Sequence, residues 1–176
     1  MTPNHQRTVI SAAAELRGSL RPLTREDADA VIPFLIMAAF PPGHELPPDA
    51  LKMPHAARWI DSWSDELGVG WDRDGELLGA AWARHVEPVI CYADDGSPLP
   101  EVIVAVSEQA RGRGLGQQMM SWLIAASKEV GDPGLSLTVS ERNPGALHLY
   151  ETLGFIRTKK TATGLIAMTR MHQENR

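Results

Sequence analysis

The sequence predicts a single-domain α/β fold in which a mixed central sheet of about six to seven strands carries helices on both faces. Two observations lead to this prediction. The 176 residues hold no internal repeat and are long enough for one buried core. Segments with strand and helix periodicity alternate in the order strand, two helices, three strands, helix, strand, helix, two strands.

The first elements are predicted from local signals. Residues 1–15 are expected to be a flexible extension, residues 16–172 the folded domain and residues 16–23 its first strand. Thr24 is expected to cap a helix, with Asp27 as the acidic partner of a capping box.

Two helices are expected between this strand and the next. Apolar residues at helical spacing continue to Ala39, and Pro33 should kink this helix or divide it in two. After a proline-rich loop, a second helix is expected over residues 49–66, with Trp59 and Trp63 packed in the core.

A hairpin follows these helices. Residues 68–71 and 76–83 have strand character and are separated by Asp72-Arg73-Asp74-Gly75, a sequence typical of a tight turn. A second turn at residues 94–96 precedes a third strand that ends at Val106.

The most informative segment begins in that third strand. The apolar run Val102–Val106 is followed by Arg111-Gly112-Arg113-Gly114-Leu115-Gly116, and a helix-like stretch then continues to Val130. Glycines let a backbone approach a ligand closely, and the first turn of a helix leaves N–H groups unpaired. A strand, a glycine-rich loop and a helix in this order therefore predict a site for an anion such as a diphosphate.

Two better-known phosphate loops do not fit this segment. A P-loop needs Gly-x-x-x-x-Gly-Lys followed by Ser or Thr, whereas Gln117 and Gln118 follow the last glycine here. A dinucleotide fingerprint needs Gly-x-Gly-x-x-Gly, and its last position falls on Gln117 or Met119.

The remaining elements are predicted downstream. Residues 135–139 alternate apolar and polar side chains as a strand does. Asn143-Pro144 suits a helix start, and Gly154 suits the end of that helix. Two further strands are expected, one from Phe155 and one over residues 165–168.

Two of these segments resemble the motifs of one family. Arg111-x-x-Gly114-x-Gly116 resembles the acyl-coenzyme A loop of the GNAT-superfamily N-acetyltransferases, and residues 143–155 resemble the second motif of that family. The resemblance is strong over residues 99–158. It implies a GNAT-like fold and transfer of an acetyl group from acetyl-CoA to a primary amine, by direct attack in a ternary complex.

The resemblance also implies roles for individual residues. The backbone of Val104, Ala105 and Val106 would pair with pantetheine, and the Val106 N–H would donate to the oxyanion. The diphosphate would bind at Arg111, Gly112, Arg113, Gly114, Leu115 and Gly116. Asn143 would contact the coenzyme in addition to capping its helix, and Tyr150 would be the general acid.

The general base is less well defined. Glu101 is the acidic residue on the strand before the loop, and a shift of one residue in register decides which face it occupies. Thr138 stands where related enzymes carry a glutamate, so that position supplies no carboxylate. Glu141, His148 and a chain of water molecules are the alternatives.

Composition narrows the function further. A net charge of −5 argues against nucleic acid as the main partner, and no apolar run is long enough to predict a membrane span. No His/Cys cluster has metal spacing, and the single Cys91 fits a cytoplasmic protein. The expected partner is an amine acceptor, either a small molecule or a protein amine, and homodimer formation is left open. The alternative function is a non-catalytic acyl-CoA-binding sensor or partner subunit with the same fold.

Overall fold

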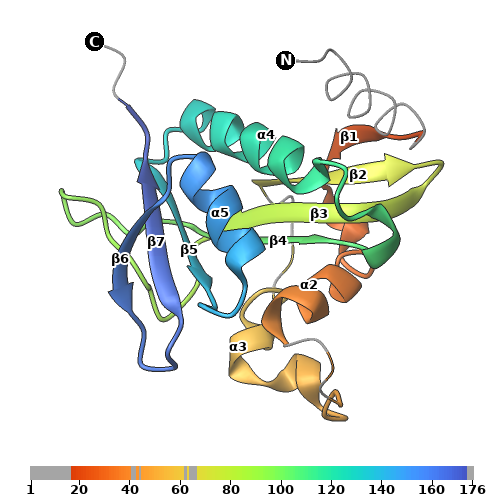
Figure 1. Cartoon of the computed structure of the whole chain (residues 1–176), viewed down its shortest axis with the longest axis horizontal. Coiled ribbons are helices and arrows are strands. Elements are labelled where there is room, and N and C mark those ends of the chain that lie inside the picture. Colours follow the sequence, from red (N-terminus) through yellow and green to blue (C-terminus); the bar gives the residue numbers. More distant parts are fainter. Residues whose placement is uncertain (1–16, 41–42, 44, 62, 64–66, 174–176) are drawn as a thin grey trace, which may run out of the picture.

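The computed structural model describes residues 17–40, 43, 45–61, 63 and 67–173. Seven strands form one sheet in the order β1-β2-β3-β4-β5-β7-β6 (Figure 1). Every neighbouring pair is antiparallel except β4 and β5, so the predicted mixed sheet is confirmed. The strands are β1 Ser19–Pro22, β2 Leu67–Arg73, β3 Glu76–Arg84, β4 Glu101–Val106, β5 Gly134–Val139, β6 Ile156–Lys160 and β7 Ile166–Met171.

Helices cover both faces of this sheet, as predicted. They are α2 Ile32–Ala39, α3 Pro54–Ala57, α4 Leu115–Glu129 and α5 Pro144–Thr152, together with the 3₁₀ turns η1 Arg25–Asp27, η2 Ala50–Lys52 and η3 Glu108–Ala110. In Figure 1, α4 lies above the strands and α2 and α3 lie below them. Side chains from α4 and α5 build one buried cluster, and side chains from α2 and Trp59 build a second cluster on the opposite face.

The capping signal at Thr24 is confirmed, but it starts a short turn. The Asp27 carboxylate accepts a hydrogen bond from the Thr24 N–H at 2.8 Å and forms an ion pair with Arg21 at 2.8 Å. The turn η1 ends at Asp27, and α2 begins at Ile32 with Pro33 in its first turn. Proline therefore divides the helical segment, because it fits only where no N–H is needed.

The prediction of a helix over residues 49–66 is wrong. The described residues of this segment form η2, the four-residue α3 and further turns. Arg84 donates to the carbonyl oxygens of Trp59 and Asp61, at 2.8 and 3.1 Å. Trp59 packs edge-on against Trp82. In a continuous helix, these carbonyl oxygens would accept hydrogen bonds from N–H groups of the same helix. Here Arg84 binds them and Trp59 packs on the sheet, so tertiary contacts override the local helical pattern.

The hairpin of β2 and β3 turns at Asp74 and Gly75, which have φ of 53° and 89°. Two consecutive residues with positive φ are typical of a two-residue turn between antiparallel strands. The expected extension at residues 1–15 lies outside the described residues, and the domain boundaries at 16 and 172 stay a prediction.

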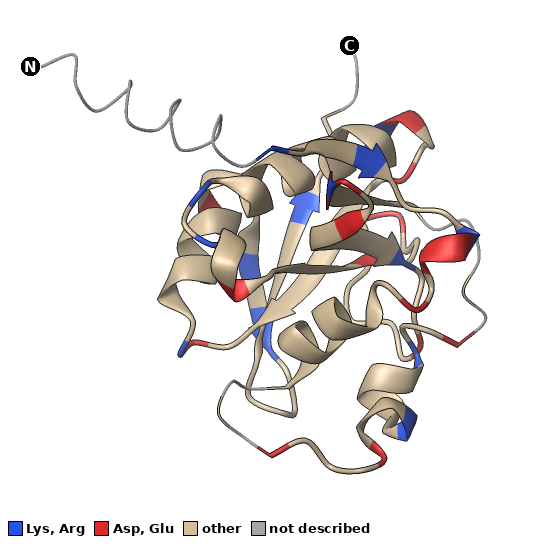
Figure 2. Cartoon of the chain, turned by 90° about the vertical axis from the view of Figure 1, so that its right-hand side faces the viewer, with Lys and Arg blue, Asp and Glu red and all other residues tan. Residues whose placement is uncertain are grey.

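Among the residues that the structure describes, no helix has the length and apolar character needed to cross a bilayer. Acidic and basic residues are interspersed along the ribbon (Figure 2).

Candidate functional site

An opening in the sheet lies between β4 and β5. Strand β4 pairs with β3 along its whole length, from Arg84↔Glu101 to Gly79↔Val106. Its pairing with β5 is limited to Glu101↔Ser136, and the two strands then diverge, as their directions in Figure 1 show. The rest of β4 therefore has a backbone edge that faces a gap in place of a neighbouring strand.

The register decides which peptide groups face this gap. The N–H of Ser107, the residue that follows β4, donates to the Leu78 carbonyl of β3 at 2.9 Å. Because peptide groups alternate along a strand, Ala105 also faces β3, whereas Val104 and Val106 direct their N–H groups toward the gap. Of the three residues predicted to line the acyl donor, two thus present their backbone N–H groups there, and Ala105 does not.

The glycine loop leads from the end of β4 into α4. Gly112 and Gly114 have φ of 72° and 77°, values that favour glycine, and Gly114 is the N-cap of α4. The first helical hydrogen bond runs from the Gln118 N–H to the Gly114 carbonyl at 3.1 Å. Within the described part of the chain, the N–H groups of residues 112–117 have no hydrogen-bond acceptor. The loop therefore offers six unpaired donors beside the positive end of a helix dipole.

Gly116 contributes in a different way. Its φ is not positive, and a Cβ added there would lie 3.5 Å from Cδ2 of Leu149 and 3.9 Å from Cγ2 of Val106. The first turn of α4 thus packs closely on α5 and on the end of β4. This contact brings the glycine loop, the end of β4 and the helix of Tyr150 close together.

The two arginines of the loop differ. The Nε of Arg111 donates to the Val106 carbonyl at 3.1 Å, which ties the loop to the end of β4. Arg113 forms no ion pair with any described residue. Both add positive charge to the loop, and their contact with a phosphate stays a prediction.

Tyr150 lies on the α4 and α5 side of the sheet. Its ring packs at 6.0 Å from the ring of Phe155, and burial raises the pKa of its phenol to about 12. The hydroxyl has no hydrogen-bond partner among the described residues. A phenol with this pKa stays protonated at neutral pH, as a general acid must.

Glu101 lies on the opposite side of the sheet, toward α2 and α3. It is 3% exposed, and Nη2 of Arg58 lies 3.2 Å from its Oε1 and 3.1 Å from its Oε2. The Thr138 hydroxyl donates to Oε1 at 3.4 Å. Since Thr138 is two residues beyond Ser136 on β5, the carboxyl group reaches across the start of the gap. Burial raises the pKa of Glu101, and Arg58 and Thr138 oppose this rise.

The alternatives for the base are placed less favourably. Glu141 lies in the loop after β5 and forms an ion pair with Lys160 at 3.0 Å. His148 is exposed on α5. Asn143 is confirmed as the N-cap of α5, since its Oδ1 accepts from the Ala146 N–H at 3.1 Å. Its contact with the coenzyme stays a prediction.

Arg58 is the residue that reasoning from the sequence missed. It follows α3 and is 43 residues before Glu101 in the chain. No local motif marks it, because its role in the site depends on how the α3 segment packs against β4. Only the tertiary structure places it there.

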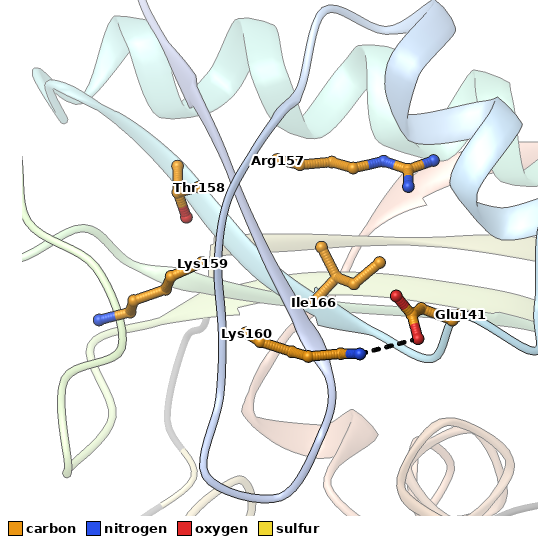
Figure 3. Close-up of a pocket in the computed structure, with 6 residues that line it drawn as sticks. All are labelled: Glu141, Arg157, Thr158, Lys159, Lys160 and Ile166. Atoms are coloured by element: carbon orange, nitrogen blue, oxygen red, sulfur yellow. Dashed lines mark ion pairs between the residues drawn. The ribbon is translucent and has the colours of Figure 1, made fainter.

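A separate open hollow lies at the β6–β7 hairpin (Figure 3). Lys160 points toward Glu141, and Arg157 forms an ion pair with Glu151 at 2.7 Å. In the sheet order, β5 lies between this hairpin and β4. These two cations already have acidic partners, so we assign the hollow no ligand. Within the described ranges, no group of three or more His, Cys, Asp or Glu side chains could hold a metal ion.

Comparisons with known proteins agree with this geometry. The chain is 37% identical over 103 residues to mycothiol acetyltransferase of Thermomonospora curvata, and 35% identical over 107 residues to that of Cellulomonas flavigena. These matches cover 57% and 58% of this chain. The chain spans only about a third of the relatives, 32% and 30% of their lengths.

Solved structures show the same fold. The protein yncA of Salmonella typhimurium, whose structure contains its cofactor acetyl-CoA, has a TM-score of 0.62 at 19% identity. That match covers 91% of this chain and 96% of yncA. The GNAT domain of S. lividans PAT has a TM-score of 0.64 at 17% identity, over 88% of this chain and 90% of that domain.

The family assignment comes from the sequence itself. The model of the acetyltransferase (GNAT) family matches residues 35–155, which is more than half of the chain and includes the gap, the glycine loop and α5. The chain therefore belongs to the acetyltransferase (GNAT) family.

Proposed function

We propose that this protein transfers an acetyl group from acetyl-CoA to a primary amine, by direct attack in a ternary complex. The observation that carries the proposal is the open edge of β4 next to a loop of unpaired N–H groups. The donors of residues 112–117 suit a pyrophosphate, and the edge of β4 suits an extended amide chain that adds to it as a strand would. A donor molecule bound in this way would bring its thioester into the gap.

The residues beside the gap supply the acid and base chemistry. A primary amine titrates near pH ~10, so Glu101 must accept a proton before the nitrogen can attack. The Val106 N–H donates to the carbonyl oxygen as negative charge develops on it. The Val104 N–H, two residues earlier on the same edge, is left for an amide of the donor chain. As the C–N bond forms and the C–S bond breaks, Tyr150 gives its proton to the leaving thiolate. The proton lost from the new amide nitrogen restores the phenol, and Glu101 releases to solvent the proton that it took from the ammonium group.

Calorimetry and a thiol-release assay test this proposal together. The folded protein should take up acetyl-CoA, and it should release coenzyme A with at least one member of an amine panel. The panel includes peptide N-termini, polyamines and the acceptor of the mycothiol acetyltransferases. Uptake without release from any amine would support the alternative of a non-catalytic sensor. Failure to take up acetyl-CoA would overturn both functions.

The pH dependence tests the base. Activity should rise as Glu101 loses its proton, at a pH above the usual range of a carboxyl group because burial raises its pKa. Glu101→Gln should lower turnover by about 10²–10³-fold and remove this limb of the pH profile. Acetyl-CoA affinity, measured by calorimetry, should not change. A Glu101→Gln variant with the activity and pH profile of the native protein would remove Glu101 from the mechanism.

Two other properties stay predictions from the sequence: a cytoplasmic location and the state of assembly. The proposed acceptor is an amine.

A further inference from the structure

Two arginine–carboxylate contacts in the described part of the chain are built differently. Arg21 uses all three of its nitrogens on carboxylates: Nη1 and Nη2 donate to the two oxygens of Asp27, and Nε donates to Asp72, at 2.8 to 2.9 Å. Arg58 directs only Nη2 toward Glu101. The first arrangement is typical of a structural ion pair, because every polar atom is used.

The Arg58–Glu101 contact leaves hydrogen-bonding groups unused. Nε of Arg58 and Oε2 of Glu101 are both buried and have no hydrogen-bond partner within the described part of the chain. The Arg58 side chain as a whole is 20% exposed, so it is not closed off from solvent. Buried donors and acceptors without partners lower stability, and native proteins keep few of them. The pair is therefore arranged to receive a further group.

The position of the pair identifies that group. The Glu101 carboxyl reaches across the start of the gap toward Thr138, where the proposed function places the acceptor amine. We propose that Arg58 selects acceptors that carry a carbonyl or carboxylate oxygen on the carbon next to the amine. The acceptor class is thus that of α-amino acids, α-amino amides and peptide N-termini.

The spacing of such a compound matches the pair. In an α-amino carbonyl compound, the nitrogen and the oxygen are about 3 Å apart. Nη2 of Arg58 lies 3.1 Å from Oε2 of Glu101. Because this separation is close to that of the nitrogen and oxygen in the acceptor, one acceptor molecule can contact both side chains at once. Its ammonium group meets the carboxylate, and its oxygen takes the unused N–H groups of the guanidinium. This inference rests on the proposed function.

Three amines test the inference in the native protein. Glycinamide carries the oxygen next to the amine-bearing carbon, β-alaninamide carries it one carbon farther away, and n-propylamine lacks it. An amine next to a carbonyl carbon titrates about two units lower than an alkylamine, so the concentration of each acceptor is counted as unprotonated amine. On this basis, with acetyl-CoA as donor, kcat/KM for glycinamide should exceed the values for the other two by at least about tenfold. Equal values for the three amines would overturn the inference. If the native protein takes up acetyl-CoA and acetylates any amine, the proposed function stands whatever this ratio is.

The variant Arg58→Lys separates selection of the acceptor from simple neutralisation of Glu101. Lysine keeps the positive charge but lacks the planar set of N–H donors. Its kcat/KM for glycinamide should fall about tenfold more than its kcat/KM for n-propylamine, which has no oxygen for the guanidinium to bind. Acetyl-CoA affinity and the unfolding midpoint show whether the variant is folded.

A matched control is Arg157→Lys on β6, where the arginine pairs with exposed Glu151. It should leave the ratio between the two amines unchanged. If Arg58→Lys lowers activity equally for both amines and shifts the pH profile, Arg58 only neutralises Glu101 and the inference fails. An unchanged ratio of kcat/KM between the two amines in Arg58→Lys would also overturn the inference.

Discussion

Two regions of this molecule form the two sides of the site, and they obtain their structures in different ways. In residues 101–154, local chemistry specifies each element: positive φ at Gly112 and Gly114, the cap at Asn143 and the stop at Gly154. In residues 45–61, contacts with distant residues decide the structure. Short turns replace the predicted second helix. Three residues of the sheet contact these turns and fix their position: Arg84, Trp82 and Glu101.

The difference matches the ligands proposed for each side. Phosphate recognition through backbone N–H groups needs a fixed backbone conformation, which a short glycine pattern can encode. Acceptor recognition uses side chains whose positions depend on packing, and Arg58 is the example here. The donor side can therefore be recognised from the sequence, whereas the acceptor side requires the fold.

The largest effect on stability is expected in the region held by tertiary contacts. Trp59 is 3% exposed and packs at 6.2 Å from the ring of Trp82. Trp59→Ala should lower the free energy of unfolding by about 3–5 kcal/mol in urea titrations. Met53→Ala, at a half-exposed position in the same segment, should cost less than about 1 kcal/mol. Similar losses for both variants would contradict the view that distant packing holds this region.

The next largest effect concerns the reaction. Tyr150→Phe removes only the hydroxyl, so the ring contact with Phe155 is kept. Turnover should fall by about 10²-fold, while the affinity for acetyl-CoA stays within about twofold. The thiol-release assay and calorimetry measure the two quantities. Unchanged turnover would leave Tyr150 with a packing role alone.

A smaller effect distinguishes the glycine loop from an ordinary turn. Gly114 and Gly96 have φ of 77° and 85°, and an added Cβ would meet no atom within 4 Å at either position. Substitution by alanine should therefore cost about 1–2 kcal/mol of stability at both positions, for conformational reasons alone. Gly114→Ala should also weaken acetyl-CoA binding, whereas Gly96→Ala should not. Equal affinities in calorimetry would argue against the loop as the phosphate site.

The smallest effect concerns the cap of α5. Asn143→Ala should cost about 1 kcal/mol, because the Ala146 N–H loses its acceptor, while Asn143→Asp keeps the cap. Chemical denaturation measures this difference. A normal stability of Asn143→Asp combined with weaker acetyl-CoA binding would support the predicted contact with the coenzyme. Unchanged binding would reduce Asn143 to a cap.

Much of the fold could be predicted from the sequence. The strand before the loop, the long helix after it, the capped helix at Pro144 and the turn at Asp74 and Gly75 all lie where local signals indicated. These elements depend on interactions between residues close in the chain. The helix expected over residues 49–66 failed because its carbonyls and side chains find partners that are distant in the sequence.

The sequence by itself determined the family and the position of the glycine loop, and it supplied the candidates for the acid and the base, since each of these depends on residue type and spacing. Only the tertiary structure decided which face of the sheet Glu101 occupies, that Val104 and Val106 direct their N–H groups to an open gap, and that Arg58 meets Glu101. Strand register and the packing of α3 set these positions. Both are properties of chain segments that meet only after folding.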